Sequence, residues 1–336
     1  MRRIAGSNHR KETRMATPIE PTAATFAGNN LSQVARRYWV AMRPAFFPAS
    51  VMPVLVGTAW GQAVAGQLEL LPASLALAAT ALVHAGANVI NDVGDELGGT
   101  DRANVERIFP YTGGSRVIQN GILSLVQMRR FGWVLIAVAT LLGVLLAMLK
   151  GPTIVWLGLG GIALAVAYSL RPLQLAARGI GEIGIGVGFG VLPVMGAAWL
   201  QSGVFNTAAL LIAVPTSVWV TAILLINEVP DLRADAANGK RTLPVRIGID
   251  GTRAVYIALH AGALLAAVAM VLRGELHWLV LTGSAALFAM ALAAARGIRE
   301  PTGATREALR GSIEKTLAIH ALGSLWIAGS ACLALR

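Results

Sequence analysis

The chain has few charged residues and almost no cysteine. Only 13% of its 336 residues are Asp, Glu, Lys or Arg, whereas a soluble domain has roughly 25%. With 55% apolar residues and a mean hydropathy of +0.64, this excludes a water-soluble enzyme and a disordered chain. The one cysteine, Cys332, excludes an intramolecular disulfide and a cysteine-based metal or iron–sulfur site. The composition indicates a protein that crosses a membrane several times.

Uncharged apolar stretches of membrane-spanning length recur along the chain, each close to the roughly 20 residues that a bilayer core requires. The stretch 183–227 is too long for one span and is interrupted by polar residues at 201–203 and at Asn206, so we divide it into two helices. The other windows are 44–68, 70–91, 131–149, 151–170, 254–272, 276–295 and 316–335. The sequence therefore predicts an all-α polytopic membrane protein with nine transmembrane helices.

The basic residues predict the orientation of these helices. With nine spans, 25 of the 28 Lys and Arg lie on one side of the membrane, and only Lys150, Arg273 and Arg336 lie on the other. Cytoplasmic connections carry an excess of Lys and Arg. We therefore expect a multi-pass protein of the cell inner membrane, with a cytoplasmic N-terminus and the C-terminus outside. The net charge of +11 then reflects topology, and no nucleic-acid partner is expected.

The N-terminal region differs in composition from the rest. Residues 1–30 are polar and basic and lack the apolar core of a secretory signal peptide, so we expect a disordered tail; Met15 is an alternative start. Residues 31–43 mix apolar side chains with arginines, which favours a short helix at the cytoplasmic interface. The nine-helix domain is expected over residues 31–336.

The acidic residues are few but concentrated. Nine of the 17 Asp and Glu follow the second and the sixth predicted helices, at the cytoplasmic face. Asp92 and Asp95 are three residues apart, and Asp231 and Asp235 are four apart, so a helical extension would place each pair on one face. An asparagine stands four residues before each pair, at Asn88 and Asn227. This weak internal repeat predicts two carboxylate sites that face each other.

Converging carboxylates repel one another unless a cation lies between them. Hard oxygen ligands select Mg²⁺, Ca²⁺ or Mn²⁺, and Mg²⁺ is commonly held by one or two carboxylates together with substrate phosphates. Basic side chains that suit phosphates follow both acid clusters: Arg102, Arg107, Arg116, Arg233, Lys240, Arg241 and Arg246. The pattern predicts a magnesium-assisted site for a diphosphate on a lipid.

These motifs support a resemblance to a known family. Asn88-x3-Asp92-x2-Asp95 and Asn227-x3-Asp231-x3-Asp235-x3-Gly239-x2-Thr242 resemble the two aspartate-rich motifs of the UbiA-type intramembrane prenyltransferases. The likeness covers about residues 36–335 and is strongest to the branch that prenylates 1,4-dihydroxy-2-naphthoate in menaquinone synthesis. Further similar stretches are 39–44, 91–101, 114–121, 168–169, 178–182 and 239–243. The resemblance implies nine helices around a central cavity.

The resemblance also implies a reaction and roles for residues. A polyprenyl group would pass from a polyprenyl diphosphate to an aromatic acceptor, giving demethylmenaquinone in the naphthoate case. Asp92 and Asp95 would hold one Mg²⁺, and Asp231 and Asp235 a second. Tyr168 would stabilise the allylic cation through its ring, or would be an interfacial aromatic without such a role. Substrate-binding residues would be Arg43, Asn88, Asp101, Arg116, Arg178, Glu182, Asn227, Lys240 and Arg241.

Three alternatives remain open at this point. Glu228 and Pro230 stand where the naphthoate branch commonly has Asn and Arg, so the acceptor could instead be 4-hydroxybenzoate, homogentisate, a glycerol-phosphate lipid or a sugar phosphate. A membrane transporter would place ionisable residues deep within its spans, whereas most acids here lie at their cytoplasmic ends. A lipid head-group transferase would carry a compact Asp-Gly-x2-Ala-Arg motif, which this sequence lacks.

Overall fold

The computed structural model describes residues 20–99, 107–169 and 172–334, and every regular element in these ranges is a helix. In chain order the elements are η1 (Ala24–Phe26), α1 (Leu31–Ala41), η2 (Pro44–Phe46), α2 (Pro48–Ala65), α3 (Leu70–Gly98), α5 (Leu125–Lys150), α6 (Thr153–Ser169), η3 (Leu175–Ala177), α7 (Gly181–Ile185), η4 (Gly186–Val191), α8 (Leu192–Ser202), α9 (Thr207–Asn227), α10 (Leu232–Ala237), α11 (Leu243–Leu272), α12 (Val280–Ala295) and α13 (Arg306–Ala334).

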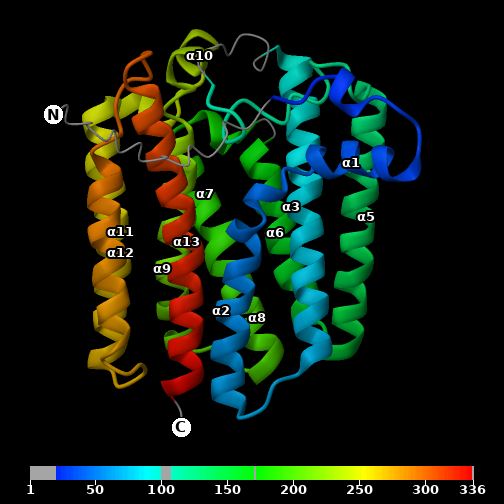
Figure 1. Cartoon of the computed structure of the whole chain (residues 1–336). Coiled ribbons are helices and arrows are strands. Elements are labelled where there is room, and N and C mark those ends of the chain that lie inside the picture. Colours follow the sequence, from blue (N-terminus) through cyan, green and yellow to red (C-terminus); the bar gives the residue numbers. More distant parts are fainter. Residues whose placement is uncertain (1–19, 100–106, 170–171, 335–336) are drawn as a thin grey trace, which may run out of the picture.

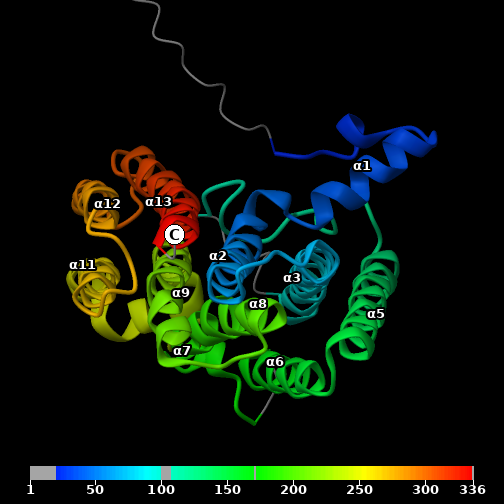
Figure 2. The same ribbon diagram turned by 90° about the horizontal axis from the view of Figure 1, so that it is seen from below.

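The long helices run side by side in one bundle (Figure 1). Seen end-on, they follow an arc from α5 through α6, α7 and α9 to α11, α12 and α13, with α2, α3 and α8 between its ends (Figure 2). α10 and the loops around it lie at the end of the bundle where α1 lies, and α13 ends at the opposite end. Both acid clusters predicted from the sequence therefore lie at the α10 end.

The number of helices that are long enough to cross a membrane agrees only in part with the predicted nine. Each of the nine predicted windows contains a helix in the described part of the chain. Within the described ranges, six helical stretches are long and apolar enough to cross a membrane, one of them the continuous run of α7, η4 and α8. α1 and α2, joined at a bend of 49°, form a seventh span if counted together. α6 and α12 are shorter apolar helices. Nine spans and their orientation stay predictions.

Two helix boundaries near the acid pairs determine on which helix each pair lies. α3 continues past the predicted end at residue 91 to Gly98, so Asp92 and Asp95 lie on its last turns as expected. α9, in contrast, ends at Asn227, and Asp231 is the N-cap of the separate helix α10. Pro230 explains the break because it has no N–H and its ring clashes with the preceding turn. The second pair therefore lies on a separate short helix and not on an extension of α9, although Asp231 and Asp235 are still joined by one helical turn.

Glycines allow the inner helices to approach closely. A Cβ on Gly57 of α2 would lie 2.2 Å from the carbonyl oxygen of Val194 in α8. The π-helical turn η4 is held against α9 in the same way, since a Cβ on Gly190 would lie 2.2 Å from Ser217 Oγ. Small residues commonly permit such contacts between membrane helices. These contacts hold α2, α8 and α9 together below the acid pairs.

The N-terminal part of the described chain is ordered by local contacts. α1 begins with a capping box formed by Asn30 and Gln33. The predicted short helix over 31–43 is thus present, and Trp39 on it is 53% exposed. Of the tail expected over 1–30, residues 1–19 lie outside the described residues, whereas 20–30 contain η1 and contact the loop before α5.

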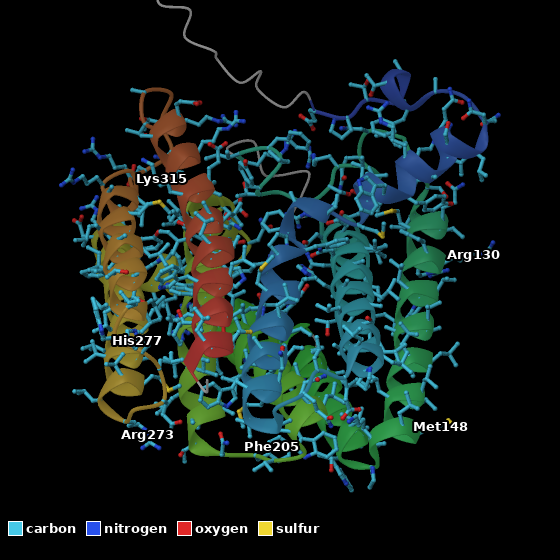
Figure 3. All side chains as sticks on the ribbon, turned by 60° about the horizontal axis from the view of Figure 1, so that its bottom comes forward. Arg130, Met148, Phe205, Arg273, His277 and Lys315 are labelled. Atoms are coloured by element: carbon cyan, nitrogen blue, oxygen red, sulfur yellow. The ribbon has the colours of Figure 1, made fainter. Side chains whose placement is uncertain are left out.

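Labelled side chains identify the two ends of the bundle. In Figure 3, Arg130 and Lys315 lie toward the α10 end, whereas Arg273, Phe205 and Met148 lie at the other end. At that second end Lys150 forms an ion pair with Glu69. Which end faces the cytoplasm remains the prediction made from the basic residues.

Candidate active site

The first acid pair projects from the last turns of α3. Asp92 is almost fully buried, with 2% exposure, and its Oδ2 accepts a hydrogen bond of 3.0 Å from the backbone N–H of Ser115. Its Oδ1 is buried and has no hydrogen-bond partner among the described residues. Asp95 is half-buried, and its Oδ2 accepts a hydrogen bond of 2.7 Å from Asn91. The pair therefore offers one buried carboxylate oxygen that a ligand can use.

The second acid pair belongs to α10. Asp231 caps this short helix, and its carbonyl accepts a hydrogen bond of 2.8 Å from the N–H of Asp235. Asp235 is 6% exposed, and its Oδ1 lies 3.5 Å from Lys240 Nζ. Burial raises the pKa of Asp235, and the charge of Asp95 acts in the same direction, whereas Lys240 lowers it. Asp95 of α3 is thus within electrostatic reach of α10.

Lys240 is under the charges of both acid clusters. Partial burial by itself lowers its pKa, but Asp235, Asp95 and Asp231 together raise the pKa above the usual lysine value. Lys240 therefore stays charged, and it is attracted to carboxylates that come from two different helices. Folding of the bundle thus brings carboxylates of α3 and α10 within electrostatic range of the same lysine.

The donor atoms around this point fit a hard divalent cation. No group of three or more His, Cys, Asp or Glu side chains in the described ranges is arranged to hold a metal by itself. The protein offers pairs of carboxylates instead, and buried oxygens at Asp92 Oδ1 and Asn227 Oδ1 have no partner there. Mg²⁺ suits such a site because it usually takes one or two carboxylates and completes its shell with waters and phosphates.

Arg43 and Asn88 line the approach to the first pair. Arg43 precedes η2 in a left-handed conformation (φ 56°), and its guanidinium donates to the carbonyl of Tyr111 at 3.1 Å. It also lies 4.8 Å from the centre of the Phe46 ring. Asn88, one turn before Asp92, donates to the carbonyl of Met42 at 3.2 Å. These contacts join the α1–α2 connection to the site face of α3.

An aromatic ring and two further acids lie beside α7. The Tyr168 ring packs against the start of that helix, where a Cβ on Gly181 would lie 3.3 Å from it. Glu182 is 5% exposed and accepts a bond of 3.3 Å from the N–H of Leu243. Burial, followed by the negative charges of Glu182, Asp235 and Asp231, raises the pKa of Glu228 well above its usual value. The Glu228 carboxyl therefore holds its proton more tightly than an exposed glutamate does.

The remaining residues that were predicted to bind substrate lie in loops around the two acid pairs or outside the described residues. Arg178 is exposed and donates to the carbonyl of Pro172, and the exposed Arg241 donates through its backbone to Ala177 at 2.9 Å. Arg116 adopts a left-handed conformation (φ 62°) in the loop that also carries Ser115. Asp101 lies outside the described residues.

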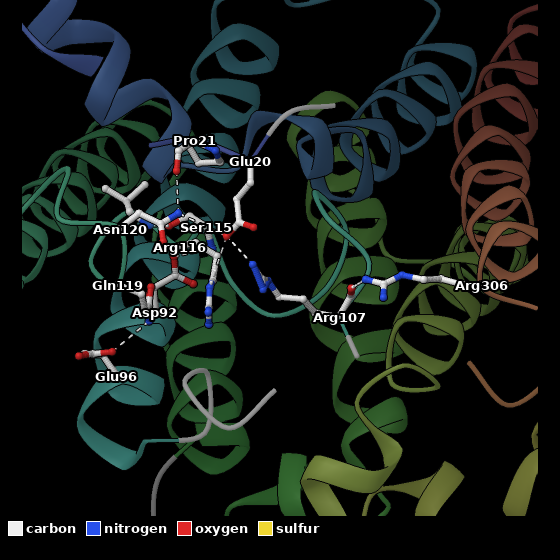
Figure 4. A network of polar contacts seen from close by, with 11 residues as sticks. Glu20, Pro21, Asp92, Glu96, Arg107, Ser115, Arg116, Gln119, Asn120 and Arg306 are labelled. Carbon is white, nitrogen blue, oxygen red and sulfur yellow. Dashed lines mark hydrogen bonds and ion pairs between the residues drawn. The ribbon is translucent and has the colours of Figure 1, made fainter. Parts of the chain in front are cut away.

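Three features of the site were not predicted. Ser115 lies in a stretch that was noted for its likeness to the family, but its bond to Asp92 depends on the folded loop (Figure 4). Glu228 was noted only as a departure, although an acid next to Asn227 signals a second carboxylate at that point. Glu20, which contacts Arg107 and Arg116, gives no signal because it lies in a polar tail.

Comparisons with known proteins agree with this arrangement. Residues 50–330 match the UbiA prenyltransferase family. The chain is 32% identical over 242 residues to 1,4-dihydroxy-2-naphthoate octaprenyltransferase of Escherichia coli (strain K12), covering 69% of this chain and 76% of that protein. It is 31% identical over 229 residues to the protein of that name from Mycobacterium tuberculosis (strain ATCC 25618 / H37Rv), covering 67% and 75%.

Solved structures share the fold. A UbiA homolog from Archaeoglobus fulgidus bound to DMAPP and Mg²⁺ aligns with a TM-score of 0.61 at 18% identity, over 85% of this chain and 99% of that one. The apo structure of a UbiA homolog from Aeropyrum pernix K1 aligns with a TM-score of 0.62 at 19% identity, over 85% and 96%. The predicted resemblance is confirmed, and the transporter alternative is set aside. The chain belongs to the UbiA prenyltransferase family and is a multi-span membrane enzyme that transfers prenyl groups.

Proposed function

We propose that this enzyme transfers a polyprenyl group from a polyprenyl diphosphate to 1,4-dihydroxy-2-naphthoate, with Mg²⁺ at the carboxylates of α3 and α10. The observation that carries the proposal is that Lys240, whose Nζ lies 3.5 Å from Asp235 Oδ1 on α10, is also under the charge of Asp95 on α3. The names of the relatives in E. coli and M. tuberculosis support this acceptor. The excess of basic residues at the α10 end supports a site that faces the cytoplasm from the inner membrane.

The residues that would hold the metal are Asp92 and Asp95 on one side and Asp231 and Asp235 on the other. Bound there, Mg²⁺ would supply positive charge against the departing diphosphate. Asn88 and Asn227 would donate their amide N–H groups to phosphate oxygens. Lys240 and Arg116 would neutralise the remaining negative charge. Arg178 and Arg241 would act at the outer edge, because their side chains are exposed.

Transfer breaks the bond between the allylic carbon and the diphosphate oxygen, and diphosphate leaves with both electrons. The Tyr168 ring would face the allylic cation so formed. The electron-rich acceptor ring then forms a carbon–carbon bond at the carbon that carries its carboxylate, and that carboxylate is lost as CO₂. Glu182 would position the acceptor, and the apolar walls of the bundle would keep water from the cation.

A transfer assay with several acceptors tests this proposal. Detergent-purified protein would receive a labelled long-chain prenyl diphosphate with either 1,4-dihydroxy-2-naphthoate or 4-hydroxybenzoate, with and without Mg²⁺. We expect a prenylated product from the naphthoate only, and none without Mg²⁺. Product only from 4-hydroxybenzoate would overturn the acceptor and leave the metal site. Product that forms equally without Mg²⁺ would overturn the role of the carboxylates.

A further inference from the structure

Two buried guanidinium groups meet one carboxylate beside the first acid pair. Arg107 forms an ion pair and a hydrogen bond with Glu20, and Arg116 Nε lies 3.8 Å from the same carboxylate oxygen (Figure 4). The two arginine side chains are only 15% and 13% exposed. Asn120 donates to this oxygen at 3.3 Å. The three side chains together form a small anion site, and Glu20 fills it.

This anion site is joined to the reaction site by the loop of residues 107–123. Ser115 of that loop donates its backbone N–H to Asp92 Oδ2 at 3.0 Å, and Arg116 is the next residue. Gln119 donates to Glu96 Oε2 at 3.1 Å, which fixes the loop to the end of α3. A group that binds Arg116 is therefore adjacent to the carboxylates proposed to hold Mg²⁺.

The chain itself delivers Glu20 to this position. Asn120 donates to the carbonyl of Pro21 at 2.6 Å, and Arg37 of α1 donates to the carbonyl of Phe26 at 2.9 Å. The segment before α1 is thus fastened at two points. A tethered group has a high effective concentration, so Glu20 competes well with a ligand that arrives from solution.

An anion from solution can nevertheless displace the Glu20 carboxylate from this site. Its side chain is 36% exposed, and a surface hollow lined by Glu20, Thr22, Ala23 and Asn120 opens beside it. Partial burial acts to raise its pKa, but hydrogen bonds from Arg107 and Asn120 and the charges of both arginines lower the pKa overall. A single carboxylate carries one negative charge against two guanidinium groups, so a more highly charged anion would bind there more strongly.

We propose that Arg107, Arg116 and Asn120 form a binding site for the diphosphate group, and that Glu20 is its internal competitor. The identity of the ligand rests on the proposed function. When a diphosphate binds, its outer phosphate takes the position of the Glu20 carboxylate, and the segment before α1 is released from the loop. Glu20 thereby lowers the affinity for diphosphate, both as part of the substrate and as the free product.

The test compares diphosphate binding in Glu20→Gln and wild type. The amide keeps the size of the side chain and removes its charge. We expect the Kd for inorganic diphosphate, measured calorimetrically with Mg²⁺, to fall roughly tenfold, the scale of one charged hydrogen bond lost by the competitor. The same measurement with a prenyl diphosphate separates the substrate from the free product. Glu300→Gln, which removes a carboxylate from an exposed ion pair with Arg233, is the matched control and should leave both Kd values unchanged.

A second variant tests the competition itself. In an Arg107→Gln background, the further change Glu20→Gln should have a much smaller effect on Kd, because the competitor has already lost its main partner. An unchanged or weaker affinity for diphosphate in Glu20→Gln would overturn the inference.

The outcomes separate this inference from the proposed function. Equal Kd values for Glu20→Gln and wild type, with normal prenyl transfer, would refute only the role of Glu20. Tighter binding by Glu20→Gln without transfer to any acceptor would support the anion site and refute the proposed acceptor chemistry. A complete lack of diphosphate binding in both proteins would refute both.

Discussion

Lys240 Nζ lies 3.5 Å from Asp235 Oδ1 on α10, and the charge of Asp95 on α3 acts on the same lysine. The compact ammonium group of a lysine can turn from the carboxylates to a bound phosphate. Without the lysine, the carboxylates would repel each other. The contact therefore links the two acid motifs before any ligand binds.

Replacement of Lys240 should weaken the reaction through diphosphate binding. We expect Lys240→Met to lower kcat/KM for prenyl diphosphate by roughly 100-fold, since one charged contact to the leaving group is lost. Lys240→Arg, which keeps the charge with another geometry, should retain part of the activity. Steady-state kinetics at several Mg²⁺ concentrations measure both. Equal kcat/KM in Lys240→Met and wild type would contradict this role.

The buried carboxyl of Glu228 should make stability depend on pH. The pKa of Glu228 is raised in the folded protein, so its contribution is fully present below the unfolded value, about 4.3, and is lost as pH rises through the folded value. The apparent Tm in detergent should therefore fall as pH rises through that range. Glu228→Gln should remove much of this slope, whereas Glu300→Gln should not. Identical slopes in Glu228→Gln and wild type would argue against a raised pKa of Glu228.

The π-helical turn η4 should tolerate no side chain at Gly190. A Cβ there would lie 2.2 Å from Ser217 Oγ, and overpacking of this kind costs about 1–3 kcal/mol. Gly190→Ala should lower the apparent Tm in detergent. Gly262→Ala in α11 is the control, because a Cβ at Gly262 meets no atom within 4 Å. A Gly190→Ala protein as stable as wild type would mean that η4 and α9 are not packed this closely.

The single cysteine allows a direct test of topology. Cys332 is exposed near the end of α13, opposite the α10 end. If the C-terminus is outside, a membrane-impermeant maleimide should label Cys332 in intact spheroplasts. A Cys332→Ser protein with Asp250→Cys should be labelled only after lysis, since Asp250 lies near the start of α11, at the α10 end, and its side chain is 94% exposed. The reverse pattern would invert the predicted orientation.

The sequence was sufficient for the fold class because the relevant signals are local. Uncharged runs of the right length identify membrane helices, and each predicted window contains a helix. The spacing of Asp92 and Asp95 placed both on the end of α3, since this helix simply continues. The second pair lies on the separate helix α10 and not on a continuation of α9, because α9 ends at Asn227 and Pro230 follows three residues later.

The sequence pattern could not predict contacts between segments that are far apart in the chain. Ser115 and Asp92 are 23 residues apart, and their bond depends on the path of a loop with a left-handed residue at Arg116. Glu20 meets Arg107 across 87 residues, from a segment whose composition predicts disorder. Such pairings are set by tertiary packing, which neither periodicity nor motif spacing describes.

Prenyl transfer by four proteins tests the central claim most directly. Wild type, Asp92→Asn, Asp235→Asn and the exposed control Asp250→Asn would each receive labelled prenyl diphosphate and 1,4-dihydroxy-2-naphthoate over a range of Mg²⁺ concentrations. If carboxylates from both α3 and α10 hold the metal with the diphosphate, both site variants should lose at least about 100-fold in rate, and their remaining activity should require more Mg²⁺. Asp250→Asn should match wild type. Wild-type rate and Mg²⁺ dependence in either Asp92→Asn or Asp235→Asn would contradict the account.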